Sequence, residues 1–114
     1  MSNPRILKIS IRELGSAAVV DLEGTIDLAN SAVLRSTLFE KLETVTRLAL
    51  NMTAVRYIDS SGIATLVEVL KRSRDLNKDL HLFGVGDAVH GVLKLTRLLS
   101  VFQIFDTEEH ALDS

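Results

Sequence analysis

Apolar and polar residues alternate at the start of the chain with the two-residue period of a half-buried strand. Leu7, Ile9 and Ile11 are apolar, and each is followed by a polar residue. A glycine-serine pair then supplies a turn before a second apolar segment, Ala17 to Leu22. This pattern predicts a β-hairpin.

The period lengthens to that of a helix in two later segments. From Asp27 to Leu42, leucines recur at every fourth position, and from Ser61 to Leu76 apolar residues recur at spacings of three and four. The second helix is predicted to bury Ile63, Leu66, Val67 and Leu70 and to expose Thr65, Glu68, Lys71, Arg72 and Asp75. Two charge pairs four residues apart are expected on its exposed face. These pairs are Glu68 with Arg72 and Lys71 with Asp75.

Short apolar runs around these helices predict further strands. The runs are "RLALNM" (Arg47 to Met52), "DLHLF" (Asp79 to Phe83) and, later, "VFQIF". A helical stripe is predicted before the last strand, and Asp106 to Leu112 is expected to add a final helical turn. The stripe consists of Ala88, Val92, Leu95 and Leu99. Because helices and strands alternate after the hairpin, the order predicts an α/β layer arrangement.

Composition narrows the class of protein. The 114 residues, 46% hydrophobic and 25% charged, indicate one globular domain spanning residues 1–114. With 13 basic and 15 acidic residues the chain has no positive excess, so we expect no nucleic-acid partner. No run approaches the roughly 18 apolar residues of a membrane span, so no membrane insertion is expected. The lack of cysteine excludes disulfides and thiol catalysis and fits a cytoplasmic protein.

Neither a metal site nor a nucleotide site is predicted. His81, His90 and His110 fall on three different elements, with no carboxylate at ligand spacing. "GVGDAV" begins like a dinucleotide fingerprint, but Val89 replaces its third glycine, and the chain has no G-K-[ST] phosphate loop. We expect a turn there, with Asp87 capping the next helix. Likewise, Asp27 in "EGTID" is expected to cap the first long helix.

The stretch "RYIDSSGIATL", Arg56 to Leu66, places two serines between a carboxylate and a glycine at a predicted strand-to-helix junction. Asp59 or Ser60 is of the type that caps a helix. A hydrolase nucleophile would need glycine where Ile58 stands and a histidine base, and the sequence singles out no such histidine. A serine at a helix N-terminus can also be a phosphorylation substrate, because free N–H groups and the helix dipole accommodate phosphate there.

These residues resemble those of small bacterial anti-sigma factor antagonists made of a single STAS domain. The resemblance runs from about Ile6 to Ala111, through "VVDLEGTIDLANS", "LALNM", "YIDSSGIATLVEVLK" and "HLFGVGDAVHGVLKLTRL". It implies an α/β fold with a mixed, mostly parallel β-sheet, an N-terminal hairpin and about four helices largely on one side. It also implies a signalling protein of transcription regulation that is not an enzyme and uses no cofactor.

The resemblance further implies a partner switch. The unphosphorylated antagonist binds an anti-sigma factor that is also a serine kinase, phosphorylation releases that partner, and a metal-dependent serine phosphatase reverses the step. Ser60 matches the family's phosphoacceptor, while Asp59, Ser61 and Gly62 shape its loop and surround the contact. Asp27 matches an acidic position near the phosphoacceptor that contributes to the partner surface.

Two other classes of function stay open at this stage. STAS components of bacterial lipid-transporting ABC systems are constitutive subunits that dock on an ATPase, and such a subunit can keep a serine at the same position. An enzyme, either a hydrolase or a nucleotidase, is the third class, and it would require turnover that depends on Ser60.

Overall fold

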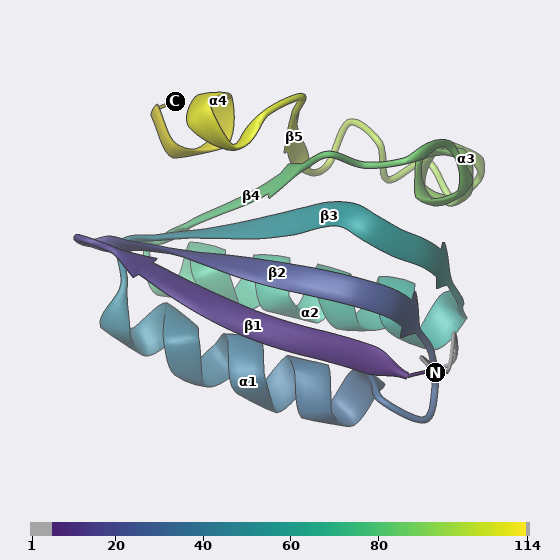
Figure 1. The fold of residues 1–114 in the computed structure, drawn as a ribbon, viewed down its shortest axis with the longest axis horizontal. Helices are drawn as coiled ribbons and strands as arrows, with labels where there is room; N and C mark the ends of the chain where they lie inside the picture. Colours follow the sequence, from purple (N-terminus) through teal and green to yellow (C-terminus); the bar gives the residue numbers. More distant parts are fainter. Residues whose placement is uncertain (1–5, 114) are drawn as a thin grey trace.

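The structure, a computed structural model, describes residues 6–113 of the chain. Strands and helices alternate after an initial hairpin (Figure 1). In chain order the elements are β1 (Leu7–Leu14), β2 (Ala17–Ile26), α1 (Ser31–Thr44), β3 (Arg47–Ile58), α2 (Ser60–Asp75), β4 (Asp79–Phe83), α3 (Asp87–Leu95), β5 (Gln103–Phe105) and α4 (Glu108–Asp113).

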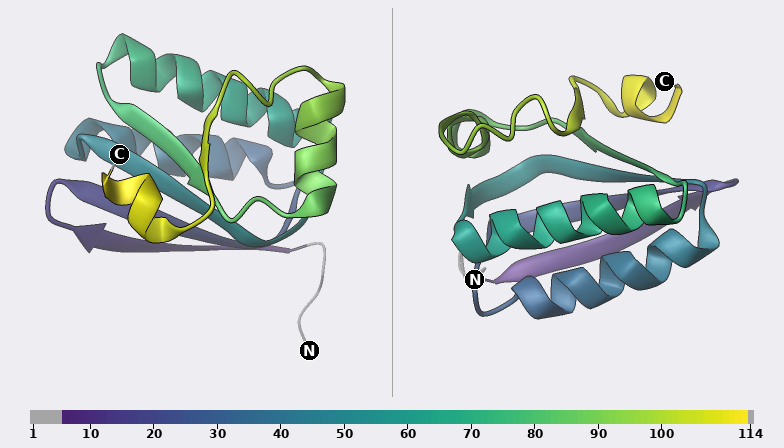
Figure 2. Two further views of the ribbon diagram at one scale, coloured as in Figure 1. Left: turned by 90° about the horizontal axis from the view of Figure 1, so that it is seen from above. Right: turned by 180° about the vertical axis from the view of Figure 1, so that it is seen from behind.

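The strands form one five-stranded sheet within the described residues, in the order β1-β2-β3-β4-β5. β1 is antiparallel to β2, and every later neighbouring pair is parallel. α1 and α2 cover one face of this sheet, and α4 lies on the opposite face (Figures 1 and 2). The structure therefore confirms the predicted α/β fold, with its N-terminal hairpin, its mostly parallel sheet and its helices largely on one side.

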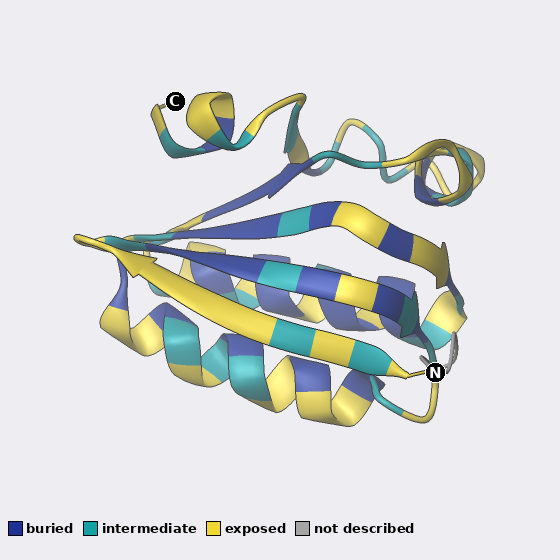
Figure 3. Cartoon of the chain, viewed as in Figure 1, coloured by how far each residue is buried: buried dark blue, intermediate teal, exposed yellow. Residues whose placement is uncertain are grey.

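The main core lies between the sheet and helices α1 and α2, and α3 adds Val89 and Leu93 to it. A smaller cluster lies on the other face under α4 and consists of Val19, Ala49, Phe83 and Ala111. Strand β2 is covered on both faces, which explains why its first half is apolar without alternation (Figure 3). The fold thus has three layers: helices α1 and α2, the sheet, and a thinner layer formed by α4.

The structure corrects the start of the first long helix. α1 begins at Ser31, not at Asp27, and the residue before it, Asn30, makes no side-chain capping hydrogen bond. The Asp27 Oδ1 atom accepts a hydrogen bond from the Ala29 N–H at 3.0 Å. Asp27 therefore stabilises a turn before the helix, and its predicted role as the helix cap is wrong. The cap predicted at Asp87 is also wrong, because Gly86 occupies the cap position of α3.

The charge pairs on α2 also differ from those expected. Glu68 pairs with Arg35, and Arg72 lies 3.7 Å from a Glu43 carboxylate oxygen, so both contacts join α2 to α1. Thr65, predicted to be exposed, is buried. Long charged side chains on neighbouring helices reach each other once the helices pack side by side, and no helical period encodes that pairing.

The apolar stripe predicted for α3 packs only in part: Val92 and Leu99 lie half-buried against the main core, whereas Ala88 is exposed. The buried residues of α3 are Val89 and Leu93. Leu95 is 86% exposed, and Leu99 lies beyond the end of the helix. No helix in the described part of the chain is long and apolar enough to cross a membrane.

Candidate functional site

Two segments that lie far apart in sequence meet at the carboxyl ends of β2 and β3. These strands are parallel, and their last residues, Ile26 and Ile58, are register partners. The residues that follow them, Asp27 and Asp59, therefore leave the sheet side by side. The edge formed by the carboxyl ends of parallel strands is where α/β proteins commonly place their binding sites.

Asp59 ties the two segments together. Its backbone N–H donates to the Ile26 carbonyl at 3.1 Å. Its Oδ1 atom accepts from the Gly62 N–H at 3.0 Å, and its Oδ2 atom accepts from the Leu28 N–H at 3.1 Å. One carboxylate thus caps α2, as the sequence predicted, and also fixes the loop before α1.

The loop before α1 carries its own set of hydrogen bonds. The Asp27 carbonyl accepts from the N–H groups of Asn30 and Ser31, at 3.2 and 2.9 Å. The Asn30 side chain returns a bond by accepting from the Asp27 N–H at 3.0 Å and donates to the Thr25 carbonyl at 2.8 Å. The Asp27 carboxylate is therefore held on a rigid turn beside the start of α2.

Ser60 is the first residue of α2 and is exposed. Over residues 6–113 its hydroxyl takes part in no hydrogen bond. Ser61, the next residue, is half-buried within the first turn. The two serines differ in access, and Ser60 is the one that another protein can reach.

Gly62 is buried and packs against the ends of both strands. A Cβ atom at this position would lie 2.6 Å from Ile58 Cγ1, 2.7 Å from Ile26 Cγ2 and 3.0 Å from the Ile26 carbonyl oxygen. The glycine therefore relieves crowding in the first turn of α2. It positions Ser60 and does not itself present surface.

Exposed apolar residues occur in the segments that meet at this junction, and sequence reasoning missed them. Leu28 is 76% exposed in the loop that Asp59 holds, and Tyr57 is 55% exposed at the end of β3. Val33, in the first turn of α1, is 62% exposed. The leucine spacing had grouped Leu28 with the apolar face of the first helix, but that helix begins only at Ser31. We call Leu28, Val33 and Tyr57 the apolar rim of the site.

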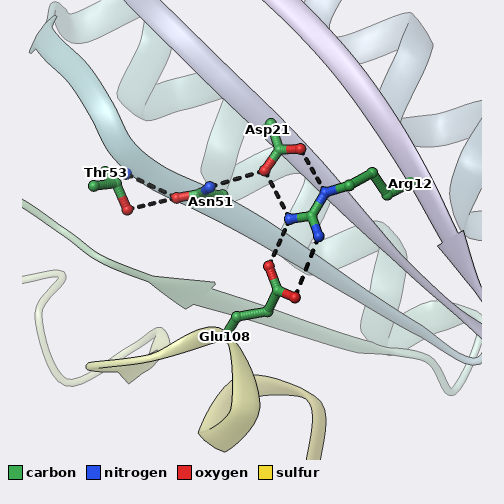
Figure 4. Close-up of polar contacts among 5 residues, drawn as sticks. All are labelled: Arg12, Asp21, Asn51, Thr53 and Glu108. Atoms are coloured by element: carbon green, nitrogen blue, oxygen red, sulfur yellow. Dashed lines mark hydrogen bonds and ion pairs between the residues drawn. The ribbon is translucent and has the colours of Figure 1, made fainter.

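A second polar cluster lies on the face of the sheet that α4 covers, away from α1 and α2 (Figure 4). Arg12 on β1 donates to both carboxylate oxygens of Asp21 on β2, at 2.7 and 2.9 Å, and to Glu108 on α4, at 2.5 and 3.3 Å. Asn51 on β3 donates to Asp21 at 2.8 Å and accepts from Thr53. The hydrogen bond from Arg12 lowers the pKa of Asp21, and the same bond raises the pKa of Arg12. This cluster fastens α4 to the sheet.

The three histidines do not converge. They lie on β4, α3 and α4, and His81 is buried with its Nδ1 atom 2.7 Å from the Ala111 carbonyl oxygen. No group of three or more potential metal ligands occurs among the described residues.

Comparison with known proteins gives one consistent family. The family model for the STAS domain matches residues 8–111. The anti-sigma-B factor antagonist of Listeria monocytogenes is 31% identical over 61 residues, which are 54% of each chain. That alignment spans only about half the length of this relative. The putative anti-sigma factor antagonist BtrV of Bordetella bronchiseptica is 24% identical over 106 residues, covering 92% of this chain and 91% of BtrV.

Solved structures show the same fold. An anti-sigma factor antagonist from Mycobacterium paratuberculosis superposes with a TM-score of 0.87 at 20% identity, covering 98% of this chain and 96% of that one. The anti-sigma factor antagonist SpoIIAA in its unphosphorylated form superposes with a TM-score of 0.81 at 20% identity, covering 93% and 94%. SpoIIAA of Bacillus in its phosphorylated form gives a TM-score of 0.74 at 19% identity, covering 93% and 97%.

Proposed function

The chain belongs to the STAS domain family, and from this premise we propose that it is an anti-sigma factor antagonist controlled by phosphorylation of Ser60. In this proposal the protein binds and does not catalyse. Its unphosphorylated form holds an anti-sigma factor that is also a serine kinase, and phosphate on Ser60 releases that partner. A metal-dependent serine phosphatase restores binding. All three proteins act in the cytoplasm, and residues 1–114 act as one domain.

The exposed hydroxyl of Ser60 carries this proposal. Ser60 is the first residue of α2, a helix of 16 residues. Within residues 6–113 its hydroxyl forms no hydrogen bond, so a kinase has none to break. Asp59 and Gly62 hold the loop in place, so a kinase meets a preformed shape and little ordering entropy is lost on binding. A structurally similar antagonist has a solved structure in its phosphorylated form, which supports the proposal that a domain of this fold can carry phosphate.

The apolar rim supplies a physical reason for binding. Full burial of a side chain such as Leu28 contributes roughly 1.5–3 kcal/mol, and the rim offers three such side chains. Asp27 and the half-buried Ser61 stand beside the rim and complete the proposed contact. The proposed partner surface therefore combines the apolar rim with the Ser60 hydroxyl and the Asp27 carboxylate.

Phosphate would oppose this contact directly. It adds about −1.5 to −2 charges next to two carboxylates, Asp27 and Asp59. A largely desolvated, unpaired double charge costs several kcal/mol, and each 1.4 kcal/mol is a factor of ten in affinity. We expect phosphorylation to weaken the complex by about a thousandfold.

The decisive experiment uses the anti-sigma factor serine kinase that this proposal names as the partner. The protein is incubated with that kinase and ATP, the phosphate is mapped by mass spectrometry, and kinase affinity is measured for Ser60→Ala, Ser60→Asp and Ser61→Ala. We expect phosphate on Ser60 alone and a large loss of affinity in Ser60→Asp. Ser61→Ala is the matched control and should be labelled like the wild type.

Other outcomes identify the other classes of function. Absence of label together with wild-type affinity in Ser60→Asp refutes the switch. Stable co-purification with a transport ATPase, independent of phosphate, would assign the chain to constitutive STAS subunits. Turnover of an ester or a nucleotide that is lost in Ser60→Ala would instead show an enzyme.

A further inference from the structure

Helix α3 packs on the main core through Val89, Val92 and Leu93 and leaves Leu95 uncovered. Val89 and Leu93 are buried in the main core, whereas Leu95 is 86% exposed. Of the stripe that the sequence predicted, Val92 and Leu99 are half-buried against the main core, and Ala88 and Leu95 are exposed.

An open groove of about 360 Å³ lies at the C-terminal end of α3. Its lining consists of Lys94, Arg97, Leu99 and Ser100. Among residues 6–113 neither Lys94 nor Arg97 forms an ion pair. Two cations and the half-buried Leu99 thus border one depression, and the exposed Leu95 follows Lys94 in the chain.

The charge of the surrounding sequence is one-sided. The chain as a whole has 15 acidic and 13 basic residues, yet Ala88 to Phe105 contains no aspartate and no glutamate. No carboxylate of this segment therefore competes for Lys94 and Arg97. The surface that complements this segment is acidic, because opposite charges across an interface favour encounter and fix its orientation.

Arg97 occupies a backbone position that suits glycine. Its φ is 61°, it follows the last residues of α3, and its N–H donates to the Lys94 carbonyl at 3.1 Å. Such left-handed positions after a helix usually hold glycine or asparagine. The corresponding position after α2 holds Asn77, with φ of 57°. An arginine in this conformation is strained, and strain of this kind points to a role for its side chain.

We propose that this groove is a second docking surface that binds an acidic segment of a partner protein. An apolar side chain of the partner packs on Leu95 and Leu99, and its carboxylates pair with Lys94 and Arg97. The groove lies on elements other than the loops around Ser60, so it binds whether or not Ser60 carries phosphate. An anionic membrane is a poorer match, because such recognition uses clusters of about 4–8 basic residues, whereas this chain carries a net charge of −2.

The test uses the full chain, labelled with ¹⁵N, and a short synthetic peptide in which paired leucines are flanked by glutamates. We expect the peptide to change amide chemical shifts only in α3 and the segment that follows it. Lys94→Glu should weaken binding by about tenfold or more. Arg97→Gly should weaken binding as well while keeping or raising the unfolding midpoint, which separates recognition from stability. Asn77→Gly, the same change after α2, is the control and should bind like the wild type.

Several outcomes would overturn the proposal. Equal binding of a peptide with lysines in place of glutamates, or shifts centred on Ser60, would show that the groove does not recognise acidic segments. Shifts that grow with protein concentration alone would assign the face to a second copy of the chain. Tighter binding to phosphatidylglycerol vesicles than to the peptide would assign it to lipid. Ser60→Asp should bind the peptide normally, so failure of the Ser60 switch and failure of the groove are told apart.

Discussion

Gly62 sets how closely the first turn of α2 approaches the ends of β2 and β3. The absent Cβ leaves space that two isoleucine side chains and a backbone carbonyl fill at 2.6–3.0 Å from its ideal position. The backbone carbonyl of Ile26 has little freedom to move, because the Asp59 N–H donates to it. A larger residue at this position must therefore displace the start of α2, and with it Ser60.

Gly62→Ala is expected to lower the free energy of unfolding by about 1–3 kcal/mol, as overpacking of a core does. Urea unfolding of the purified variant measures the change. Gly91→Ala is the matched control: Gly91 lies inside α3, and a Cβ added there would meet nothing within 4 Å. There alanine should stabilise the helix by roughly 0.5–1 kcal/mol. Equal effects of the two changes would contradict the packing role of Gly62.

At the same scale, the sequence predicted Asp59 as a cap because a carboxylate directly before a helix commonly accepts its free N–H groups. The second bond of Asp59, from the Leu28 N–H, joins segments 31 residues apart in sequence. Nothing in the local pattern encodes that contact. The exposure of Leu28 and Tyr57 was missed for the same reason, since it depends on how two loops meet at the edge of the sheet.

At the scale of elements, the sequence located each helix and strand but not their limits. The leucine stripe placed α1 correctly, yet Asp27 forms a local turn that delays the helix to Ser31, as aspartate often does. β3 extends to Ile58, well past the predicted Met52. Register shifts between β2 and β3 interrupt its two-residue period there, which hides the second half of the strand.

For α3 the sequence offered two apolar stripes, and the chosen one was only partly right, because Ala88 and Leu95 are exposed. Val89 and Leu93 are four residues apart, as are Ala88 and Val92, so helical spacing alone does not decide which pair faces the core. The preceding turn decides it, because Gly84 takes a φ of 68° and directs the chain into α3. A Cβ at Gly84 would lie 2.2 Å from Thr53 Oγ1, so this turn packs closely on β3.

The contact of α4 with the sheet is expected to depend on pH through Asp21. The hydrogen bond from Arg12 lowers the pKa of Asp21 in the folded state below its ordinary 3.8. A lowered folded-state pKa contributes stability above pH 3.8, and that contribution disappears as the pH falls through the folded-state value. Asp21→Asn should therefore reduce the unfolding free energy at pH 7 more than at pH 2.5. Arg12→Ala removes the hydrogen-bond donor. In this variant, too, the free energy of unfolding should therefore change less between pH 7 and pH 2.5.

Urea unfolding as a function of pH measures this prediction, and hydrogen exchange of the α4 amides shows whether the helix loosens. Glu13 is a second carboxylate whose pKa is lowered, by a hydrogen bond from Lys41, so Glu13→Gln is the control. It should change the pH dependence without changing exchange in α4. An acid limb that is identical in wild type and Asp21→Asn would contradict the role given to the Arg12 contact.

At the scale of the molecule, the sheet separates two kinds of surface. One face carries the main core and helices α1 and α2, whose N-terminal ends stand at the edge where β2 and β3 finish (Figure 2). The other face carries a thin layer under α4, fastened by Arg12 and Glu108. The proposed switch lies at the edge and depends on both loops being rigid. If the proposal holds, a charge added there changes what the surface binds while leaving both layers intact.

This arrangement predicts that Ser60→Asp changes binding without changing the fold. The new carboxylate stands at the N-terminus of α2, where the helix dipole favours it by about 0.3–1 kcal/mol, while Asp59 opposes it by a similar amount. The free energy of unfolding, measured in urea, should therefore stay within about 0.5 kcal/mol of the wild-type value. Changes in amide chemical shifts should be confined to the loops before α1 and α2. Gly62→Ala, two residues away, adds no charge but should lower the free energy of unfolding. Equal destabilisation by both changes would mean that Ser60 acts through the fold and not through the surface.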